Sequence, residues 1–402
     1  MKIGIIKETK IPVDNRVALT PKQVSALNQQ FTEHEIVVQE SAVRAFSDEE
    51  YRNEGVRVVS NVDDCDVLFG IKEAKIETLI PNKHYIFFGH MAKMQAYNRP
   101  LALAMIEKKL TFSDYEYLVD DNNQRLCAFG WWAGAVGVYY TLRGYGLRSH
   151  SFELPKPDIK FTLTQLIDNL KSIKLPAAKV LVTGGGRVSQ GAQYVLNEIG
   201  AIKLEESAYC AQNSVEKLSY AVADVDKLVV RTDAEAFDMS YFVKHPENHK
   251  SDFMRWAEAT DILICAHFWA ANAPVYLDQA SLRNSRNRIR MIGDVTCDIM
   301  GSVKSTIRSS THMDPYYDYN PSTEKEEAPF SNENNITVMA VDTCPNALPM
   351  DTSEYFGEML IQHVFNPLLK GEDLKVLTRA TIFNKGKLTE RFHYLTDFVS
   401  HE

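Results

Sequence analysis

Three cationic side chains in the first hundred residues are of types that bind carboxylates and exchange protons. Arg16 lies in a polar loop, Lys72 directly follows the apolar run VLFGI, and His90 follows IFFG. Lysine and histidine act as general acids and bases when burial or neighbouring charges adjust their pKa. Arginine and lysine side chains hold carboxylates. These residues therefore indicate acid–base chemistry on a substrate that carries carboxylates.

The elements that must position these residues are short β-branched or aromatic runs separated by helical segments. The runs are MKIGIIKE (1–8), EIVVQE (35–40), VRVVS (56–60), CDVLFGIKE (65–73) and HYIFFGH (84–90). Thr20-Pro21 predicts the start of a helix that continues to about residue 30. Such alternation predicts a mostly parallel sheet with helices on its faces, and sheets of this kind bind ligands beyond the carboxyl ends of their strands. Lys7, Lys72 and His90 lie at such ends.

A second motif, in residues 181–206, combines an apolar run, three glycines and a helical pattern. Gly184 can adopt a turn conformation that a side chain would forbid, and Gly186 lets backbone amides approach a pyrophosphate at the helix N-terminus. The predicted cofactor turn comprises Gly184, Gly185, Gly186, Arg187 and Val188. A plain surface turn is the alternative, but the order of strand, turn and helix favours a dinucleotide.

The strand expected at 201–204 ends in Glu205-Glu206, where a dinucleotide fold places the acid that accepts the adenosine ribose hydroxyls. Two acids without a nearby arginine favour NAD over NADP. Ser189 replaces the third glycine of the GxGxxG pattern, although serine is small enough for close packing of helix and strand.

Other segments predict further elements. Residues 128–148, rich in glycine, alanine and aromatic residues, predict a long buried helix or a helix that links two domains; a membrane span is the less favoured alternative. Residues 207–226 predict an insertion or irregular structure, and residues 311–335 a long surface loop. We expect an amphipathic helix at 351–370 and a helical tail at 374–402.

Length and composition limit the possible functions. A chain of 402 residues predicts about two domains. The net charge of −9 and the absence of a basic block argue against nucleic acid or an anionic membrane as the main partner. With no apolar run of spanning length and no leader before the first strand, we expect a cytoplasmic protein. Six scattered cysteines indicate free thiols, in preference to disulfides or a metal site, and no metal is expected.

Six motifs resemble the alanine dehydrogenase and pyridine nucleotide transhydrogenase family, and within it the NAD-dependent, lysine-forming saccharopine dehydrogenases. The motifs are NRVALTP (15–21), FGIKEAK (69–75), FGHMAK (88–93), DYEYL (114–118), RLCAFGWWAGAVG (125–137) and VDTCPNALP (341–349). The RVALTP and IKE pieces of the first two motifs are shared by the whole family. FGHMAK and RLCAFGWWAG indicate the saccharopine branch, because alanine dehydrogenases carry different residues there.

The resemblance implies two Rossmann-like domains with mostly parallel sheets and an active site in the cleft between them. Residues 1–128, completed by 345–402, would form the substrate and catalytic domain, and residues 129–344 the NAD-binding domain. A cysteine that some relatives carry at the position of Val188 is absent, so their disulfide to the position of Cys265 cannot form.

The resemblance also implies roles for individual residues. Lys72 and His90 would be the acid–base pair, and Arg16 would hold a substrate carboxylate. Four further positions would line the substrate site: Lys93, Glu116, Arg125 and Asp342. Asp294 and Asp298 would lie near the nicotinamide.

The expected reaction is the NAD-dependent conversion of saccharopine to lysine and 2-oxoglutarate, or its reverse, by an oxidoreductase acting on a CH–NH bond. Two alternatives remain open at this point. One is another NAD-dependent amino-acid dehydrogenase, such as alanine dehydrogenase. The other is a non-catalytic NAD-binding protein on the same fold. The partners expected are small-molecule substrates, and both a monomer and a homo-oligomer are compatible with the sequence.

Overall fold

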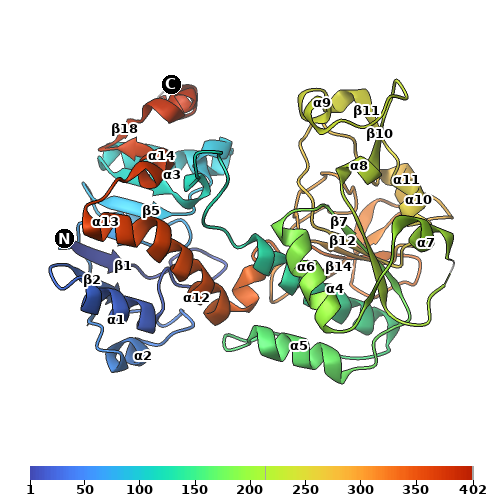
Figure 1. The fold of residues 1–402 in the computed structure, drawn as a ribbon, viewed down its shortest axis with the longest axis horizontal. Helices are drawn as coiled ribbons and strands as arrows, with labels where there is room; N and C mark the ends of the chain where they lie inside the picture. Colours follow the sequence, from blue (N-terminus) through green and yellow to red (C-terminus); the bar gives the residue numbers. More distant parts are fainter. Residues whose placement is uncertain (213, 401–402) are drawn as a thin grey trace. The chain divides into compact units, whose positions relative to one another are not determined.

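Two eight-stranded, mostly parallel sheets organise the chain, which confirms the predicted α/β class (Figure 1). A computed structural model describes residues 1–212 and 214–400. Each sheet belongs to its own compact unit. Unit 1 comprises Met1–Phe129 and Leu348–Glu402, and unit 2 comprises Gly130–Ala347.

The sheet of unit 1 has the strand order β18-β17-β6-β5-β4-β1-β2-β3. Its strands are β1 (Lys2–Ile5), β2 (Glu35–Gln39), β3 (Val58–Val59), β4 (Val67–Phe69), β5 (His84–Phe87), β6 (Thr111–Asp114), β17 (Thr381–Asn384) and β18 (Lys387–Leu388). Its α-helices are α1 (Pro21–Gln30), α2 (Asp48–Asn53), α3 (Arg99–Glu107), α12 (Pro349–Leu360), α13 (Asn366–Lys370), α14 (Lys375–Ala380) and α15 (Thr396–Val399). The six strands β1 to β6 pair in parallel, because helical or irregular segments connect them over the faces of the sheet.

Local sequence accounts for the start of α1 but not for the C-terminal tail. Thr20 caps α1 in a reciprocal capping box with Gln23, and Pro21 occupies the first turn, as the sequence predicted. The prediction of a helical tail was wrong for residues 381–388, which form β17 and β18 at the edge of the sheet. The reason is packing, since Ile382 and Phe383 are buried against the core of unit 1.

The sheet of unit 2 has the strand order β15-β14-β16-β13-β12-β7-β9-β8. Its strands are β7 (Lys179–Thr183), β8 (Ile202–Lys203), β9 (Ser219–Ala223), β12 (Ile262–Cys265), β13 (Met291–Asp294), β14 (Tyr316–Asn320), β15 (Lys325–Glu327) and β16 (Ile336–Met339). A separate hairpin pairs β10 (Val229–Arg231) with β11 (His249–Ser251). The α-helices are α4 (Gly130–Ser149), α5 (Leu163–Ser172), α6 (Arg187–Glu198), α7 (Glu206–Ala211), α8 (Val225–Leu228), α9 (Met239–Lys244), α10 (Met254–Ala257) and α11 (Gln279–Arg283).

Two segments of unit 2 that were expected to be irregular contribute strands to the sheet. Residues 219–223, expected within an insertion, form β9, which pairs in parallel with β7 along its whole length. Residues 316–320, expected within a surface loop, form β14, which pairs antiparallel with β16. Both predictions were wrong because each strand is a short run with aromatic residues between polar segments, and polar segments are typical of loops. Tyr317 and Tyr319 are buried in the core once β14 joins the sheet.

The glycine-rich helix α4 packs against α6, the helix that follows the glycine turn. A Cβ on Gly134 would overlap the carbonyl oxygen of Val188, and one on Gly191 would overlap that of Trp131. The two helix backbones therefore approach more closely than any larger residue would allow, as the small residues of 128–148 predicted. This contact holds α6 in place behind the glycine turn.

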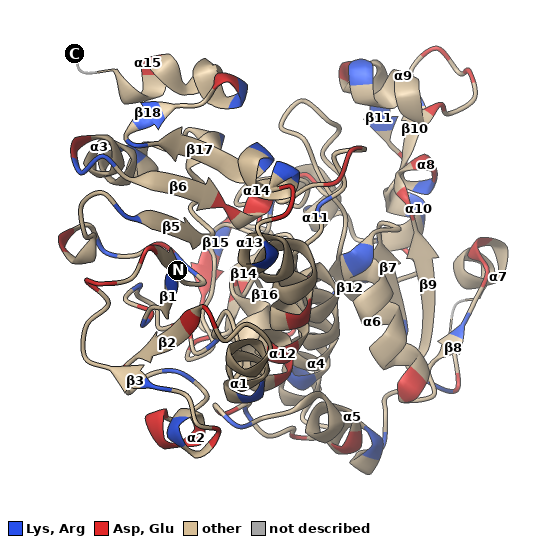
Figure 2. Cartoon of the chain, turned by 60° about the vertical axis from the view of Figure 1, so that its left-hand side comes forward, with Lys and Arg blue, Asp and Glu red and all other residues tan. Residues whose placement is uncertain are grey.

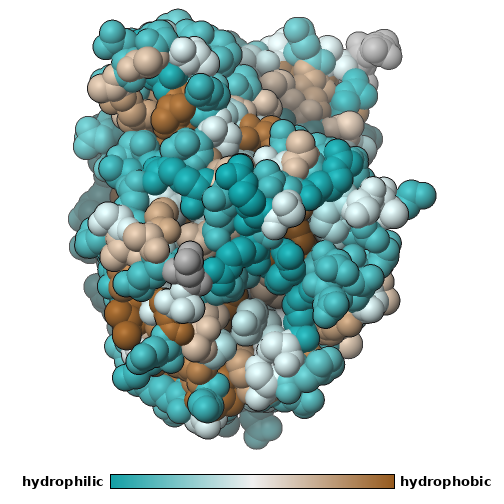
Figure 3. All heavy atoms as spheres, turned by 90° about the vertical axis from the view of Figure 1, so that its right-hand side faces the viewer, coloured by the Kyte–Doolittle hydropathy of each residue, from teal (hydrophilic) through white to brown (hydrophobic). Residues whose placement is uncertain are grey.

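Basic and acidic residues are interspersed along the elements of both units (Figure 2). On the face drawn in Figure 3, hydrophilic residues predominate and hydrophobic ones form small groups. Within residues 1–212 and 214–400, no helix combines the length and the hydrophobicity needed to cross a bilayer. None of the six cysteines forms a disulfide, and four of them are buried.

Candidate active site

The acid–base candidates of unit 1 come from the carboxyl ends of four adjacent parallel strands. In the order of the sheet these strands are β6, β5, β4 and β1. Glu116 follows β6, His90 follows β5, Lys72 follows β4 and Glu8 follows β1. Because the carboxyl ends of parallel strands lie at one edge of a sheet, four segments that are far apart in the sequence deliver their side chains to the same region.

Glu116 is the centre of a cluster of charged groups at this edge. Its Oε1 lies 3.2 Å from His90 Nδ1, 3.2 Å from Lys93 Nζ and 3.6 Å from Arg125 Nη2. Burial by itself would raise the pKa of Glu116, but His90, Lys93 and Arg125 outweigh burial and lower the pKa to about 2. The Glu116 carboxylate is therefore ionised at all physiological pH values and gathers three of the predicted residues around it.

We expect Glu116→Gln to lower the free energy of unfolding at neutral pH and to flatten its dependence on acid pH. A folded-state pKa near 2 lies below the ordinary value of about 4.3, so the stabilisation is complete above about pH 4.5 and is lost as pH falls toward 2. The full effect is at most about 3 kcal/mol. Urea unfolding at pH 7 and pH 3 measures it. The matched control is Glu107→Gln, at an exposed residue of α3, and equal pH slopes in both variants would contradict the prediction.

The turn that carries Lys72 is held by Glu8, a residue that the sequence analysis did not select. Glu8 accepts hydrogen bonds from the backbone N–H groups of Ile71 (2.6 Å) and Lys72 (2.9 Å). Burial, followed by the nearby Asp14 carboxylate, raises the pKa of Glu8 to about 8. Burial, followed by Arg16, lowers the pKa of Lys72, which favours proton exchange near neutral pH. The sequence does carry a signal for Glu8, because an acidic residue that follows a buried strand is a candidate for the site.

Asp114 holds the turn that carries His90 in the same way as Glu8 holds the turn of Lys72. It too was not predicted from the sequence. Its carboxylate accepts hydrogen bonds from the backbone N–H groups of Gly89 (3.1 Å) and Glu116 (2.9 Å). Burial, followed by Glu116, raises the pKa of Asp114 to about 7. His90 itself adopts a left-handed backbone conformation with φ of 52°. Such a conformation persists in a non-glycine residue when neighbouring groups hold the turn, as Asp114 does here.

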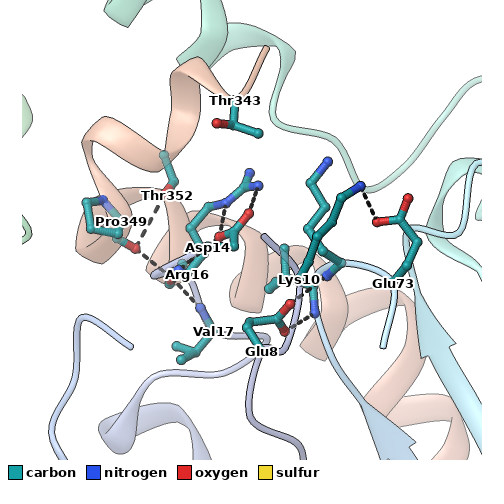
Figure 4. Close-up of polar contacts among 12 residues, drawn as sticks. Glu8, Lys10, Asp14, Arg16, Val17, Glu73, Thr343, Pro349 and Thr352 are labelled. Carbon is teal, nitrogen blue, oxygen red and sulfur yellow. Dashed lines mark hydrogen bonds and ion pairs between the residues drawn. The ribbon is translucent and has the colours of Figure 1, made fainter. Parts of the chain in front are cut away.

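Arg16 is buried and paired within unit 1. Its guanidinium donates to both carboxylate oxygens of Asp14, at 2.9 Å and 2.5 Å (Figure 4). It also lies 4.2 Å from the centre of the Phe129 ring. Lys10 pairs with Glu73 nearby, at 2.7 Å. Arg16 is thus held in a fixed orientation by Asp14, whereas the side chains of Lys93 and Arg125 are about half exposed.

The glycine turn of unit 2 connects β7 to α6. Gly184 has φ of +85°, and a Cβ there would lie 2.8 Å from His267 Cα and 2.9 Å from the carbonyl oxygen of Ala266. Gly186 is the N-cap of α6 and has no side chain to occupy the helix end. A Cβ added to Gly186 would meet no atom within 4 Å, so the space in front of the helix is open. Arg187 and Val188 form the first turn of this 12-residue helix. The unfilled N-terminus fits a pyrophosphate, because its backbone N–H groups and dipole favour an anion.

A pocket of about 340 Å³ adjoins this turn within unit 2. It is lined by Gly184, Gly185, Gly186 and Asp224, and otherwise mainly by apolar residues of α9 and of the loop after β12, among them Met239, Phe242, Val243, Phe268 and Trp269. An apolar pocket beside an anion-binding turn suits a ligand with a flat ring joined to a phosphate.

The predicted acids Glu205 and Glu206 do not line this pocket. They follow β8, which β9 separates from β7. Glu206 pairs with Arg255 and lies 3.8 Å from Lys227, and Glu205 is exposed at the start of α7. The role of these acids at the adenosine ribose stays a prediction, and the strand that pairs with β7 is β9 and not β8.

The remaining predicted residues of unit 2 follow β13 and β16. Asp294 is buried at the end of β13 and accepts hydrogen bonds from the hydroxyls of Thr296 and Thr306, both at 2.6 Å. Burial raises its pKa. Asp294 therefore anchors the loop that also contains Asp298, which is partly buried. Asp342 is exposed just after β16.

Comparison with known proteins finds similarity to enzymes of amino-acid metabolism. Residues 4–136 match the family described as alanine dehydrogenase/PNT, N-terminal domain. Saccharopine dehydrogenase [NAD(+), L-lysine-forming] of Emericella nidulans is 25% identical, with 96% of this chain and 98% of that protein covered. Alpha-aminoadipic semialdehyde synthase of Arabidopsis thaliana is 27% identical over 98% of this chain.

The two kinds of relative differ in length. The chain spans 41% of the Arabidopsis protein, so it covers less than half of that relative. Among solved structures, an L-alanine dehydrogenase has the same fold, with a TM-score of 0.65, 16% identity and complete coverage of both chains.

Proposed function

We propose, from the premise that this chain is a homologue of the NAD(+)-dependent, L-lysine-forming saccharopine dehydrogenases, that it interconverts saccharopine with L-lysine and 2-oxoglutarate. In this proposal unit 2 binds NAD and unit 1 binds the amino acid and supplies the acid–base groups. The observation that carries the proposal is the convergence of Lys72, His90 and Glu116 at the ends of neighbouring strands.

The oxidation of a secondary amine requires proton transfers that two groups of unit 1 can perform. When bound, the nicotinamide ring accepts the hydride from the carbon next to the amine. Lys72, whose pKa is lowered by burial, would take the proton from the saccharopine nitrogen in its neutral form. His90 would then remove a proton from the water that adds to the imine carbon, which gives a carbinolamine. Protonation of its nitrogen and loss of its hydroxyl proton would break the C–N bond and release lysine and 2-oxoglutarate.

The charged side chains around His90 suit a substrate that carries carboxylates as well as an ammonium group. Lys93 and Arg125 are cations with exposed side chains that can reach carboxylates, as the predicted roles require. Glu116, ionised and buried beneath them, keeps His90 and both cations together and offers a carboxylate to the distal ammonium of lysine. Arg16, fixed by Asp14, presents a further positive charge near Lys72.

We expect the full chain to oxidise NADH in the presence of 2-oxoglutarate and lysine together, and at least a hundredfold more slowly with pyruvate and ammonia. The reason is that the clustered charged side chains match a dicarboxylate with a second amino group, whereas pyruvate offers them one carboxylate and no second amino group. Absorbance at 340 nm follows the reaction. Faster turnover with pyruvate and ammonia would identify an alanine dehydrogenase instead. Binding of NADH without turnover on either pair would indicate a non-catalytic protein.

A further inference from the structure

We infer that Asp224, rather than Glu205 or Glu206, accepts the adenosine ribose hydroxyls of the dinucleotide, and that α9 forms the wall beside the adenine. This inference rests on the proposed function, since it concerns the cofactor of that same site. It assigns a role to the segment between β9 and β12, which the predicted cofactor residues left out.

The strand order provides the first argument. β9 lies directly beside β7, and β8 lies on the far side of β9. Neighbouring strands are spaced by about 4.8 Å, so the end of β9 is about 5 Å from the strand that carries the glycine turn, and the end of β8 about 10 Å. Only one methylene group separates the ribose from its phosphate. The acid that binds the ribose must therefore follow the adjacent strand, and Asp224 is the first residue after β9.

The side-chain geometry provides the second argument. A Cβ on Gly185 would collide with Asp224 Oδ2, so the carboxylate lies directly against the turn. Asp224 Oδ1 accepts a hydrogen bond from the Val225 backbone N–H at 2.8 Å, which fixes the carboxylate and leaves Oδ2 on the side of Gly185. Glu206, in contrast, is engaged by Arg255 and Lys227.

The exposed hydrophobic residues provide the third argument. Met239 and Val243 of α9 and Phe268 of the opposite loop are 50%, 71% and 91% exposed, and all three line the pocket. Exposed apolar side chains grouped around one pocket indicate a surface that a ligand covers. α9 is held there by its own aromatic contacts, since the rings of Phe242 and His249 are 5.0 Å apart. Figure 1 shows α9 beside the β10–β11 hairpin that carries His249.

The charge of the pocket indicates which dinucleotide it binds. No lysine or arginine is among the described residues that line it, whereas Asp224 contributes a carboxylate. A ribose 2′-hydroxyl can donate a hydrogen bond to that carboxylate, but a 2′-phosphate would meet a like charge without a cation to compensate. The pocket therefore selects NAD over NADP.

The test is a fluorescence titration of the full chain with NADH and with NADPH. We expect the wild type to bind NADH at least tenfold more tightly than NADPH. Asp224→Asn should raise the dissociation constant for NADH about tenfold and reduce the preference over NADPH, because it removes the charge and keeps the acceptor that caps α8. Glu205→Gln and Glu206→Gln, the matched controls, should change neither constant by more than twofold.

A second variant tests the adenine wall. Val243→Ser, at a largely exposed position, should weaken the binding of NADH, NADPH and 5′-AMP by similar factors without changing the melting temperature. An unchanged NADH to NADPH ratio in Asp224→Asn, or weaker NADH binding in Glu205→Gln, would overturn the inference while leaving the proposed function intact. A wild type that turns over saccharopine with NADP alone would also overturn it. A wild type that binds neither dinucleotide would overturn both.

Discussion

Replacing Lys72 by methionine is expected to lower turnover by about 10²- to 10⁴-fold, which is the usual contribution of a general acid or base. Methionine keeps an unbranched side chain of similar length, so packing around the partly buried stem is retained while the amine is lost. His90→Asn should lower turnover by a similar factor, and asparagine tolerates the left-handed backbone that His90 adopts. Initial rates with saccharopine and NAD measure both effects.

NADH affinity should be nearly unchanged in both variants, because the glycine turn and its pocket belong to unit 2. The matched control is Lys75→Met, three residues after Lys72 on the same loop, where the lysine is exposed. Its turnover should stay within twofold of the wild type. Turnover of Lys72→Met within threefold of the wild type would refute the acid–base assignment. A parallel loss of NADH binding would instead indicate a structural effect.

Gly184→Ala is expected to weaken NADH binding by at least a hundredfold. The added methyl group would lie 2.8 Å from His267 Cα and 2.9 Å from the Ala266 carbonyl oxygen, and backbone atoms cannot move away as a side chain can. The positive φ adds a cost of about 1 kcal/mol. The turn must therefore shift, and the amides at the start of α6 lose their alignment with the pyrophosphate. Fluorescence titration with NADH measures the loss.

Two other glycines separate the causes of this effect. Gly200 has a similar φ of +79° and open space around a Cβ, so Gly200→Ala reports the backbone cost alone and should leave NADH binding unchanged. Gly186→Ala also meets no protein atom within 4 Å, so the stability of the protein should not change. We expect it to weaken NADH binding at least tenfold, because the methyl group would stand where the phosphate approaches the helix. Undiminished NADH binding in both Gly184→Ala and Gly186→Ala would exclude this turn as the dinucleotide site.

The sequence by itself determined the features that depend on short stretches of chain. The alternation of apolar and helical segments predicted mostly parallel sheet structure, and Thr20-Pro21 predicted the first turn of α1. It also indicated that Lys72 and His90 follow strands, because a buried strand can be recognised from a few neighbouring residues. The motifs shared with saccharopine dehydrogenases selected the acid–base candidates among the many charged residues of the chain.

The tertiary structure alone decided which strands are neighbours and which groups meet. Glu8 binds the backbone of Lys72, 64 residues away, and no local pattern encodes such a contact. The position of β9 between β7 and β8 brings Asp224 next to Gly185 of the glycine turn. Both outcomes have the same physical cause. Strand pairing and buried hydrogen bonds are chosen by the packing of distant segments, whose free energy depends on the whole core and not on the propensity of any one segment.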